Sequence, residues 1–148
     1  MPTYTVTTAN VTLTPAQHDA IAAAITDAHK SNTGAPGFFA QVIFVALPDL
    51  KHYIGGKPNR TPHVFVHGLI RAGRSADVKA GLIQDIAMQV RDIAGVGAED
   101  VWVYVLDIPP RQMVEFGRVL PDPGAEDEWR KGISALKRQE LAAAGVEI

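Results

Sequence analysis

The stretch His63-Val-Phe-Val-His-Gly-Leu69 decides the fold, together with the helical pattern and the strand that follow it. Residues 63–69 are rich in the β-branched and aromatic side chains that strands favour. Ser75 is a good N-cap for a helix with apolar side chains at three- and four-residue spacing, which ends at Gly95. Residues 101–106, Val-Trp-Val-Tyr-Val-Leu, then predict a second strand. We therefore predict a strand–helix–strand (βαβ) unit at about residues 63–106.

A similar unit is predicted at about residues 2–47. Its first strand covers residues 3–8, and a helix capped by Thr14 follows over residues 15–31. The apolar residues 39–47 are predicted to form a buried strand. Between the two units, the glycines and prolines of the intervening segment indicate a loop or a short hairpin.

The two units match each other when the sequence is shifted by about 61 residues, which places Thr14 on Ser75 and Gly34 on Gly95. This agreement favours a structural repeat over chance similarity. Two βαβ units give an α+β fold with a four-stranded mixed sheet and two helices on one face. The other face of the sheet then needs a partner or an oligomer.

The C-terminal segment 107–148 has a different character. Its prolines interrupt regular structure, and a last helix is predicted from about Glu128 to Ala144. Acidic residues at the start of this helix suit its dipole, and Gly145 suits its end. With 148 residues, the chain is predicted to be one domain over residues 1–148.

Composition excludes several classes of function. Lys and Arg number 14 against 16 Asp and Glu, a net charge of −2, which argues against a nucleic-acid-coating or membrane-surface protein. The absence of cysteine excludes disulfides, a zinc ribbon, an iron–sulfur cluster and a thiol nucleophile. Without a signal-peptide pattern or an apolar run of ~20 residues, a cytoplasmic protein is expected.

Pro2 is the first candidate catalytic group. The initiator methionine is usually removed before a small residue such as proline, which would leave a secondary amine at the N-terminus. An α-amino group titrates near ~7.7–8.0, so it can act as a general acid or base near neutral pH. The alternative is that Pro2 only protects the terminus. If Met1 is retained, the nitrogen is an amide and this chemistry is impossible.

Arg71 and Arg74 precede the second predicted helix in the sequence Arg-Ala-Gly-Arg-Ser. The helix dipole disfavours cations at this position, but two guanidinium groups beside free helix N–H groups suit a carboxylate or a phosphate. The alternative is a pair of solvated arginines. His29 lies near the end of the first helix, at the margin of its apolar face, where the dipole alone favours a histidine.

The remaining candidates have simpler structural interpretations. Tyr104 shares a strand face with Trp102, which is typical of packing. Glu115 lies in an apolar stretch. It is interpreted either as a general base whose pKa is raised or as a residue on the surface of a helix. His63 and His67 lie on one strand face without further residues at metal-ligand spacing, so no metal site is predicted.

These residues stand in long contiguous motifs. The motifs are the Met-Pro start, Thr-Asp-Ala-His29, Phe65-Val-His-Gly-Leu-Ile-Arg-Ala-Gly-Arg-Ser75, Trp102-Val-Tyr104 and Gln112-Met-Val-Glu-Phe-Gly-Arg-Val-Leu-Pro-Asp-Pro-Gly124. In this combination the chain resembles the cis-3-chloroacrylic acid dehalogenase family of the tautomerase superfamily, from Pro2 through Trp129. The resemblance implies a tautomerase-like tandem βαβ fold, a homotrimer, a small carboxylate substrate and no cofactor.

The resemblance also implies roles for six residues. Pro2 corresponds to the catalytic proline. His29, Arg71 and Arg74 correspond to the residues that hold and polarise the substrate carboxylate. Tyr104 and Glu115 correspond to the pair that positions and activates water. The implied activities are tautomerisation of enol and 2-oxo acids such as phenylpyruvate and hydrolytic dehalogenation of cis-3-haloacrylates.

The loop after the first helix departs from the family pattern. Thr33 is kept, but Ala35 replaces a hydroxyl-bearing residue and Phe39 replaces a smaller leucine. Changes of this kind cost ~1–3 kcal/mol in transition-state binding. We therefore expect Thr33 and Phe39 to contact the substrate and dehalogenation to be weak. The alternatives are an efficient dehalogenase that forms malonate semialdehyde and a non-enzymatic trimeric binding protein.

Overall fold

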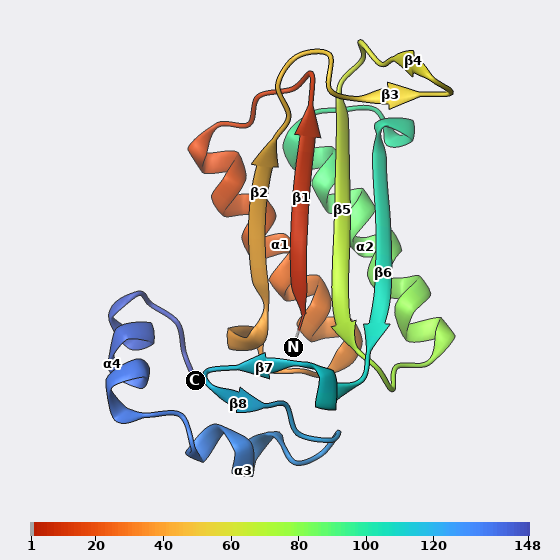
Figure 1. The fold of residues 1–148 in the computed structure, drawn as a ribbon. Helices are drawn as coiled ribbons and strands as arrows, with labels where there is room; N and C mark the ends of the chain where they lie inside the picture. The colour runs from red at the N-terminus through yellow and green to blue at the C-terminus, as the bar shows by residue number, and fades with distance from the viewer. Residues whose placement is uncertain (1) are drawn as a thin grey trace.

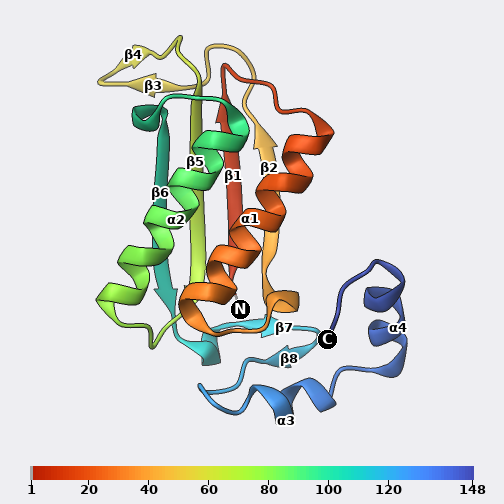
Figure 2. The ribbon, with the colours of Figure 1, turned by 180° about the vertical axis from the view of Figure 1, so that it is seen from behind.

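A four-stranded mixed sheet with two long helices on one face forms the body of the protein in the computed structural model, which describes residues 2–148 (Figures 1 and 2). The strand order is β2-β1-β5-β6. The pairs β1–β2 and β5–β6 are parallel, whereas β1 and β5 are antiparallel. The elements of this body are β1 (Thr3–Ala9), α1 (Pro15–Thr33), β2 (Gln41–Ala46), β5 (His63–Arg71), α2 (Ala76–Ala94) and β6 (Val101–Ile108).

The two βαβ units begin and end their helices in the same way, as the repeat predicts. Thr14 accepts a hydrogen bond from the backbone of Gln17 and completes a capping box, and Ser75 accepts one from Val78. Both helices end at a glycine with positive φ, Gly34 and Gly95. Only glycine adopts this left-handed conformation without strain, which explains why both helices stop there.

The main core lies between the sheet and the two helices. Alternate side chains of the central strands point toward the helices and are fully buried; these include Tyr4 and Val6 of β1 and Val64 and Val66 of β5. They pack against Ile21, Ile25, Leu82, Ile86 and Val90 of the helices. This layer fixes the ends of β1, α1 and β5 relative to one another.

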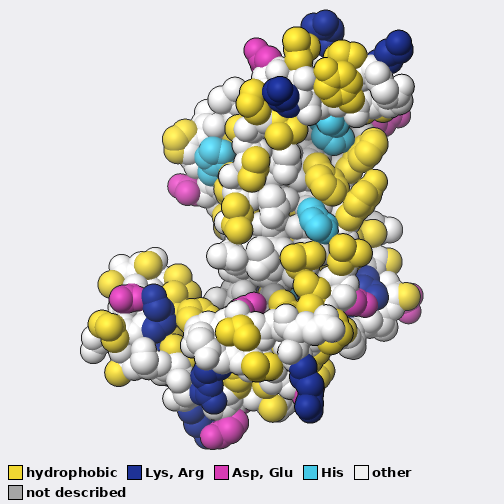
Figure 3. Space-filling view, in the orientation of Figure 1, with side chains coloured by type: hydrophobic (Ala, Val, Ile, Leu, Met, Phe, Trp, Pro, Cys, Tyr) yellow, Lys and Arg dark blue, Asp and Glu magenta, His cyan; other side chains and the backbone are white. Residues whose placement is uncertain are grey.

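The opposite face of the sheet is open in the single chain and carries exposed apolar side chains of the edge strands (Figure 3). Its exposed side chains include Ile43, Val45, Trp102, Tyr104 and Leu106. The prediction of a buried strand over residues 39–47 is therefore wrong for this chain, since β2 is an edge strand whose outer face is exposed. Its first predicted residue, Phe39, belongs instead to a short 3-10 helix, Gly37–Phe39.

Two short hairpins extend from the ends of the sheet. Of the loop or short hairpin predicted between the units, the structure shows the hairpin, formed by β3 (Tyr53–Ile54) and β4 (Lys57–Pro58). The second hairpin, β7 (Val114–Glu115) and β8 (Arg118–Val119), lies below the sheet in Figure 1, near the start of β1. Short 3-10 helices, Ala98–Asp100 and Pro110–Gln112, precede β6 and β7.

The single C-terminal helix predicted from Glu128 to Ala144 is instead two helices, α3 (Glu126–Lys131) and α4 (Ala135–Ala143). The break follows Lys131, close to Trp129, whose carbonyl accepts hydrogen bonds from the backbone N–H of Gly132 and from the Arg118 guanidinium. Ser134 then caps α4 through the backbone of Lys137. A second buried cluster of Phe39, Leu120, Trp129 and Ile133 anchors this segment beneath the sheet.

Candidate active site

A small pocket lies where β1 and β2 begin, β5 ends and the two long helices meet the C-terminal segment. The residues that line it are Pro2, His29, Ala35, Phe39, Arg71, Arg74 and Glu126. Pro2 is buried, and its carbonyl accepts a hydrogen bond from the backbone N–H of Gln41 at 2.9 Å. The structure therefore brings together five of the sequence-predicted site residues, Pro2, His29, Phe39, Arg71 and Arg74. The predicted removal of Met1 lies outside the described residues.

His29 reaches the pocket from the last turns of α1 and is only 5% exposed. Its Nδ1 lies 2.8 Å from the hydroxyl of Tyr4, which is itself fully buried. Burial, followed by the positive charges of Arg74 and Arg71, lowers the pKa of His29 to about 4. The imidazole is therefore neutral at physiological pH.

Tyr4 decides which nitrogen of this neutral imidazole carries the proton. Burial raises the pKa of Tyr4 well above its ordinary value, so the phenol keeps its proton. No other acceptor for the hydroxyl is found within residues 2–148, so we assign Tyr4 as the donor to Nδ1 of His29. The ring proton then sits on Nε2, which can donate to an anion or a carbonyl oxygen.

Gly68 makes room for Tyr4 on the neighbouring strand. A Cβ at this position would lie 2.5 Å from Cε1 of Tyr4, well inside normal contact distance. Any larger residue would displace the tyrosine ring and the histidine that it holds. Tyr4 was not predicted as a site residue, although a buried tyrosine on the helix side of β1 needs a polar partner for its hydroxyl.

The free energy of unfolding should fall as the pH drops from about 6.5 toward about 4, because unfolding lets His29 take up a proton that its buried site disfavours. Fully developed, this loss amounts to ~3 kcal/mol. Denaturant titrations across this pH range, at one protein concentration, measure it. His29→Gln should lose this part of the pH dependence, with His67→Gln as the control. An unchanged dependence in His29→Gln would contradict the buried neutral imidazole.

Arg71 lies at the end of β5 and is only 7% exposed. Its Nη1 donates to the carbonyl of Pro121 at 3.1 Å, and its Nη2 forms a short ion pair with Glu126. Burial acts to raise the pKa of Glu126, but the hydrogen bond and charge of Arg71 and two backbone N–H groups outweigh it and hold that pKa below its usual range. Arg71 is therefore already paired with a carboxylate of the same chain.

Arg74 lies two residues before the start of α2, and in the described part of the chain it has no such pairing. Its Nε is buried, and within residues 2–148 it finds no hydrogen-bond partner. Burial and the positive charge of Arg71 lower the pKa of Arg74, and Glu126 and Asp107 partly offset this. A second cation is thus held in an unfavourable setting, which an incoming anion would relieve.

Thr33 and Phe39 hold the rim of the pocket. The Thr33 hydroxyl donates to the carbonyl of His29 at 2.7 Å and accepts from the backbone of Ala35. Thr33 lines an outer cleft that also contains Arg71, Arg74 and Glu126, rather than the inner pocket itself. Phe39 lines the inner pocket and is 4% exposed, because it also packs on Trp129.

Tyr104 and Glu115 do not lie in this pocket. Tyr104 is 54% exposed on the open face of the sheet, beside Phe65. Glu115 belongs to β7, not to a helix, and lines a separate groove with residues that include Thr3, Gln41 and Phe39. Phe39 is common to the groove and the pocket. The pair expected to act on water is therefore not assembled within one chain.

Glu126 is the second residue of the site that was not predicted from the sequence. Glu126 is the first of three consecutive acidic residues, which are typical of the start of a helix. No local signal indicated that it contacts Arg71, 55 positions earlier in the sequence. Within residues 2–148, no group of three or more potential ligands is arranged to hold a metal ion. In the same part of the chain, no helix is long and apolar enough to cross a bilayer.

Comparison with known proteins agrees with this architecture. Residues 1–132 match the sequence model of the family described as "Putative oxalocrotonate tautomerase enzyme". The crystal structure of N1, a member of the cis-3-chloroacrylic acid dehalogenase family, is 33% identical with a TM-score of 0.85, covering 95% of this chain and 99% of that one. Curated protein sequences give no match.

Two further structures extend the comparison. The fused 4-OT named Q0, a symmetric trimer, is 26% identical with a TM-score of 0.70, covering 76% of this chain and 90% of that one. Macrophage migration inhibitory factor of Toxoplasma gondii is 17% identical with a TM-score of 0.68, covering 80% of this chain and 99% of that one. The last likeness concerns the fold alone.

Proposed function

Since the chain belongs to the tautomerase superfamily and to its cis-3-chloroacrylic acid dehalogenase family, we propose that it is a tautomerase that uses the amine of Pro2 on small enol and 2-oxo acids. One observation carries the proposal: Pro2 lines the same pocket as His29 and two arginines. An amine that exchanges protons therefore adjoins a site that suits a carboxylate.

The tautomerisation follows from the charges in this pocket. Arg74 and the Nε2–H of His29 bind the carboxylate and the 2-oxygen of an enol acid such as phenylenolpyruvate. In this direction the reaction uses the neutral form of the Pro2 amine. That amine accepts the proton of the enol hydroxyl and returns a proton to C3, which leaves the ketone.

Hydrolytic dehalogenation would use the same pocket with Pro2 protonated. Water, activated by Glu115 and Tyr104, adds to C3 of a cis-3-haloacrylate, and Pro2 gives its proton to C2. The adduct then loses halide and a proton and becomes malonate semialdehyde. We propose that this activity is weak, because Ala35 and Phe39 both line the pocket and differ from the family pattern.

Two assays separate this proposal from its alternatives. Ketonisation of phenylenolpyruvate and halide release from cis- and trans-3-chloroacrylate are measured on protein whose N-terminus has been determined by intact mass. Fast ketonisation with slow release from the cis isomer supports the tautomerase. Comparable second-order rates favour the dehalogenase, and absence of both activities in protein that lacks Met1 favours the binding protein.

We further propose that the protein is a homotrimer in which a neighbouring copy supplies Tyr104. Support comes from the trimeric 4-OT relative and from the open apolar face, on which Tyr104, Trp102 and Leu106 are exposed. Patches of this kind mark interaction surfaces. A pocket that lacks Tyr104 in one chain is completed when the faces of three chains meet.

Leu106→Arg is expected to dissociate the trimer, because it places a charge on the proposed interface. Light scattering should give three times the chain mass of 15.9 kDa for the wild type and a smaller mass for the variant. Leu136→Arg on α4, which is also exposed, serves as the matched control. A monomeric wild type, or a Leu106→Arg protein that stays trimeric, would contradict the proposed interface.

A further inference from the structure

The C-terminal segment inserts a carboxylate of its own into the pocket that the proposed function assigns to a substrate carboxylate. Glu126, the first residue of α3, lines the pocket together with Pro2, His29, Arg71 and Arg74. One of its carboxylate oxygens pairs with Nη2 of Arg71. Glu126 therefore stands among the groups of the site rather than on the outer surface of α3.

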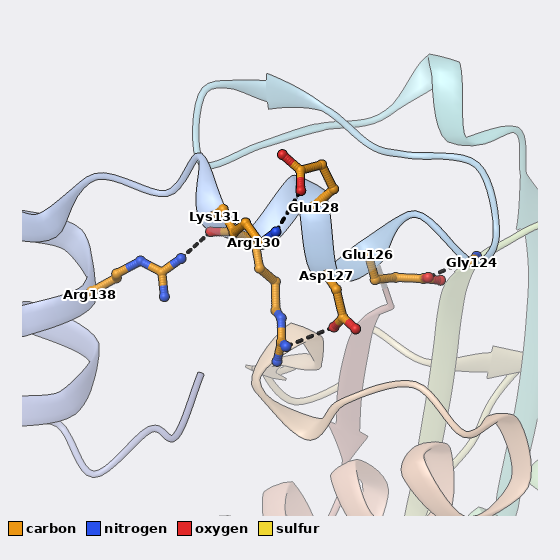
Figure 4. A network of polar contacts seen from close by, with 7 residues as sticks. All are labelled: Gly124, Glu126, Asp127, Glu128, Arg130, Lys131 and Arg138. Atoms are coloured by element: carbon orange, nitrogen blue, oxygen red, sulfur yellow. Dashed lines mark hydrogen bonds and ion pairs between the residues drawn. The ribbon is translucent and has the colours of Figure 1, made fainter.

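Several contacts hold this carboxylate in place. The backbone N–H of Gly124 donates to Oε2 of Glu126 at 2.8 Å (Figure 4). The other terminal nitrogen of the Arg71 guanidinium, Nη1, donates a hydrogen bond to the carbonyl of Pro121 at 3.1 Å. The segment around Glu126 and the side chain of Arg71 therefore hold each other in place. Both side chains are largely shielded from water, since Glu126 is 23% exposed and Arg71 is 7% exposed.

The neighbouring acidic residues of α3 behave differently. Asp127 pairs with Arg130 and Glu128 with Lys131, each within one turn of the same helix and both with strongly exposed carboxylates (Figure 4). Such pairs contribute little to stability. Glu126 alone among the three turns away from its helix and into the pocket.

The charge balance of the pocket follows from the ion pair of Glu126 and Arg71. Arg71, Arg74 and Glu126 together carry one net positive charge, and the neutral His29 and the neutral Pro2 amine that tautomerisation uses add none. One incoming carboxylate balances that charge through Arg74. A second carboxylate would be unbalanced and would lie close to the negative charge of Glu126 in a partly buried setting, where repulsion is only weakly screened.

We propose that Glu126 determines specificity by occupying Arg71 as a built-in carboxylate, so that the pocket accepts small monocarboxylates and rejects dicarboxylates. This inference rests on the proposed function, since it concerns the acid that binds beside Pro2. A substrate carboxylate that displaced Glu126 from Arg71 would have to break a shielded ion pair and two backbone contacts. The substrate therefore binds beside this ion pair, on Arg74, and leaves it in place.

The test uses two probes of similar shape and different charge, cis-but-2-enoate and maleate. Calorimetry measures the dissociation constant of each for the full chain, after intact mass has established its N-terminus. The wild type should bind cis-but-2-enoate more tightly than maleate. Glu126→Gln, which keeps the size and an acceptor oxygen for Arg71, should shift that ratio toward maleate by about tenfold.

Glu128→Gln removes the same charge from the exposed side of α3 and should leave the ratio unchanged. Two results would overturn the proposal alone: a wild type that prefers maleate, which needs no variant, and a Glu126→Gln protein with an unchanged ratio. An unchanged ratio with both acids bound more tightly would mean that Glu126 competes with every carboxylate instead of selecting between them. Failure of the wild type to bind either acid would overturn the proposed function itself.

Discussion

Replacing Pro2 with alanine should lower kcat/KM for ketonisation of phenylenolpyruvate by about 10²- to 10⁴-fold, the contribution typical of a positioned acid or base. Alanine exchanges the rigid secondary amine for a primary amine on a freer chain end. Pro2 is buried and is fixed through its carbonyl by Gln41, so the ring holds the nitrogen in the pocket. Loss of the ring removes that positioning.

The measurement needs controls for folding and for processing. Intact mass must show the same N-terminal state in both proteins, and thermal unfolding must show the same stability. Pro15→Ala, at the exposed start of α1, exchanges a proline that has no part in the pocket. Full activity of Pro2→Ala, on both the enol acid and the haloacrylate, would show that the proline ring is not needed to position the amine.

Replacing Arg74 with alanine should raise KM for the same substrate by about 10- to 100-fold, since hydrogen bonds to charged groups contribute ~1.5–3 kcal/mol. Arg74 is the guanidinium group with a buried, unsatisfied Nε, whereas Arg71 is held by Glu126 and Pro121. The incoming carboxylate therefore finds its strongest free partner in Arg74.

Arg74→Lys retains the charge but loses the planar two-pronged geometry, so its KM should fall between those of the wild type and Arg74→Ala. The matched control is Arg91→Ala at the far end of α2, where the arginine forms an exposed pair with Asp92. A KM that stays at the wild-type value in Arg74→Ala would show that the carboxylate is bound elsewhere.

Local signals in the sequence predict the body of the fold well. The caps at Thr14 and Ser75 and the stops at Gly34 and Gly95 are confirmed, because capping and positive φ depend on neighbouring residues alone. The four main strands lie close to their predicted ranges. Their arrangement as one mixed sheet with helices on one face is also confirmed.

The predictions that fail depend on contacts distant in sequence. At the interruption of the C-terminal helix, Arg118 donates to the carbonyl of Trp129 from another element, in addition to the local cap at Ser134. The apolar pattern of residues 39–47 resembles a core strand, yet β2 lies at the edge of a sheet whose outer face is exposed in the single chain. Periodicity reveals that a face is apolar but not what covers it.

The same limit explains which parts of the site could be predicted. The family motifs indicate Pro2, His29, Arg71 and Arg74, and these four line one pocket. Tyr4 and Glu126 were not foreseen, because their partners lie 25 and 55 positions away. Tyr104 belongs to a family motif but lies on the open face of the sheet. Its predicted role therefore depends on a neighbouring copy of the chain.

The central claim is that a free amine on Pro2 performs the chemistry beside a carboxylate site. Mass spectrometry of the N-terminal peptide, after incubation with an electrophilic alkynyl carboxylic acid, tests this claim most directly. We predict one adduct, on the nitrogen of Pro2 in a chain that lacks Met1, formed more slowly in Arg74→Ala. A catalytically active protein that retains Met1, or whose N-terminal peptide stays unmodified, would contradict the account.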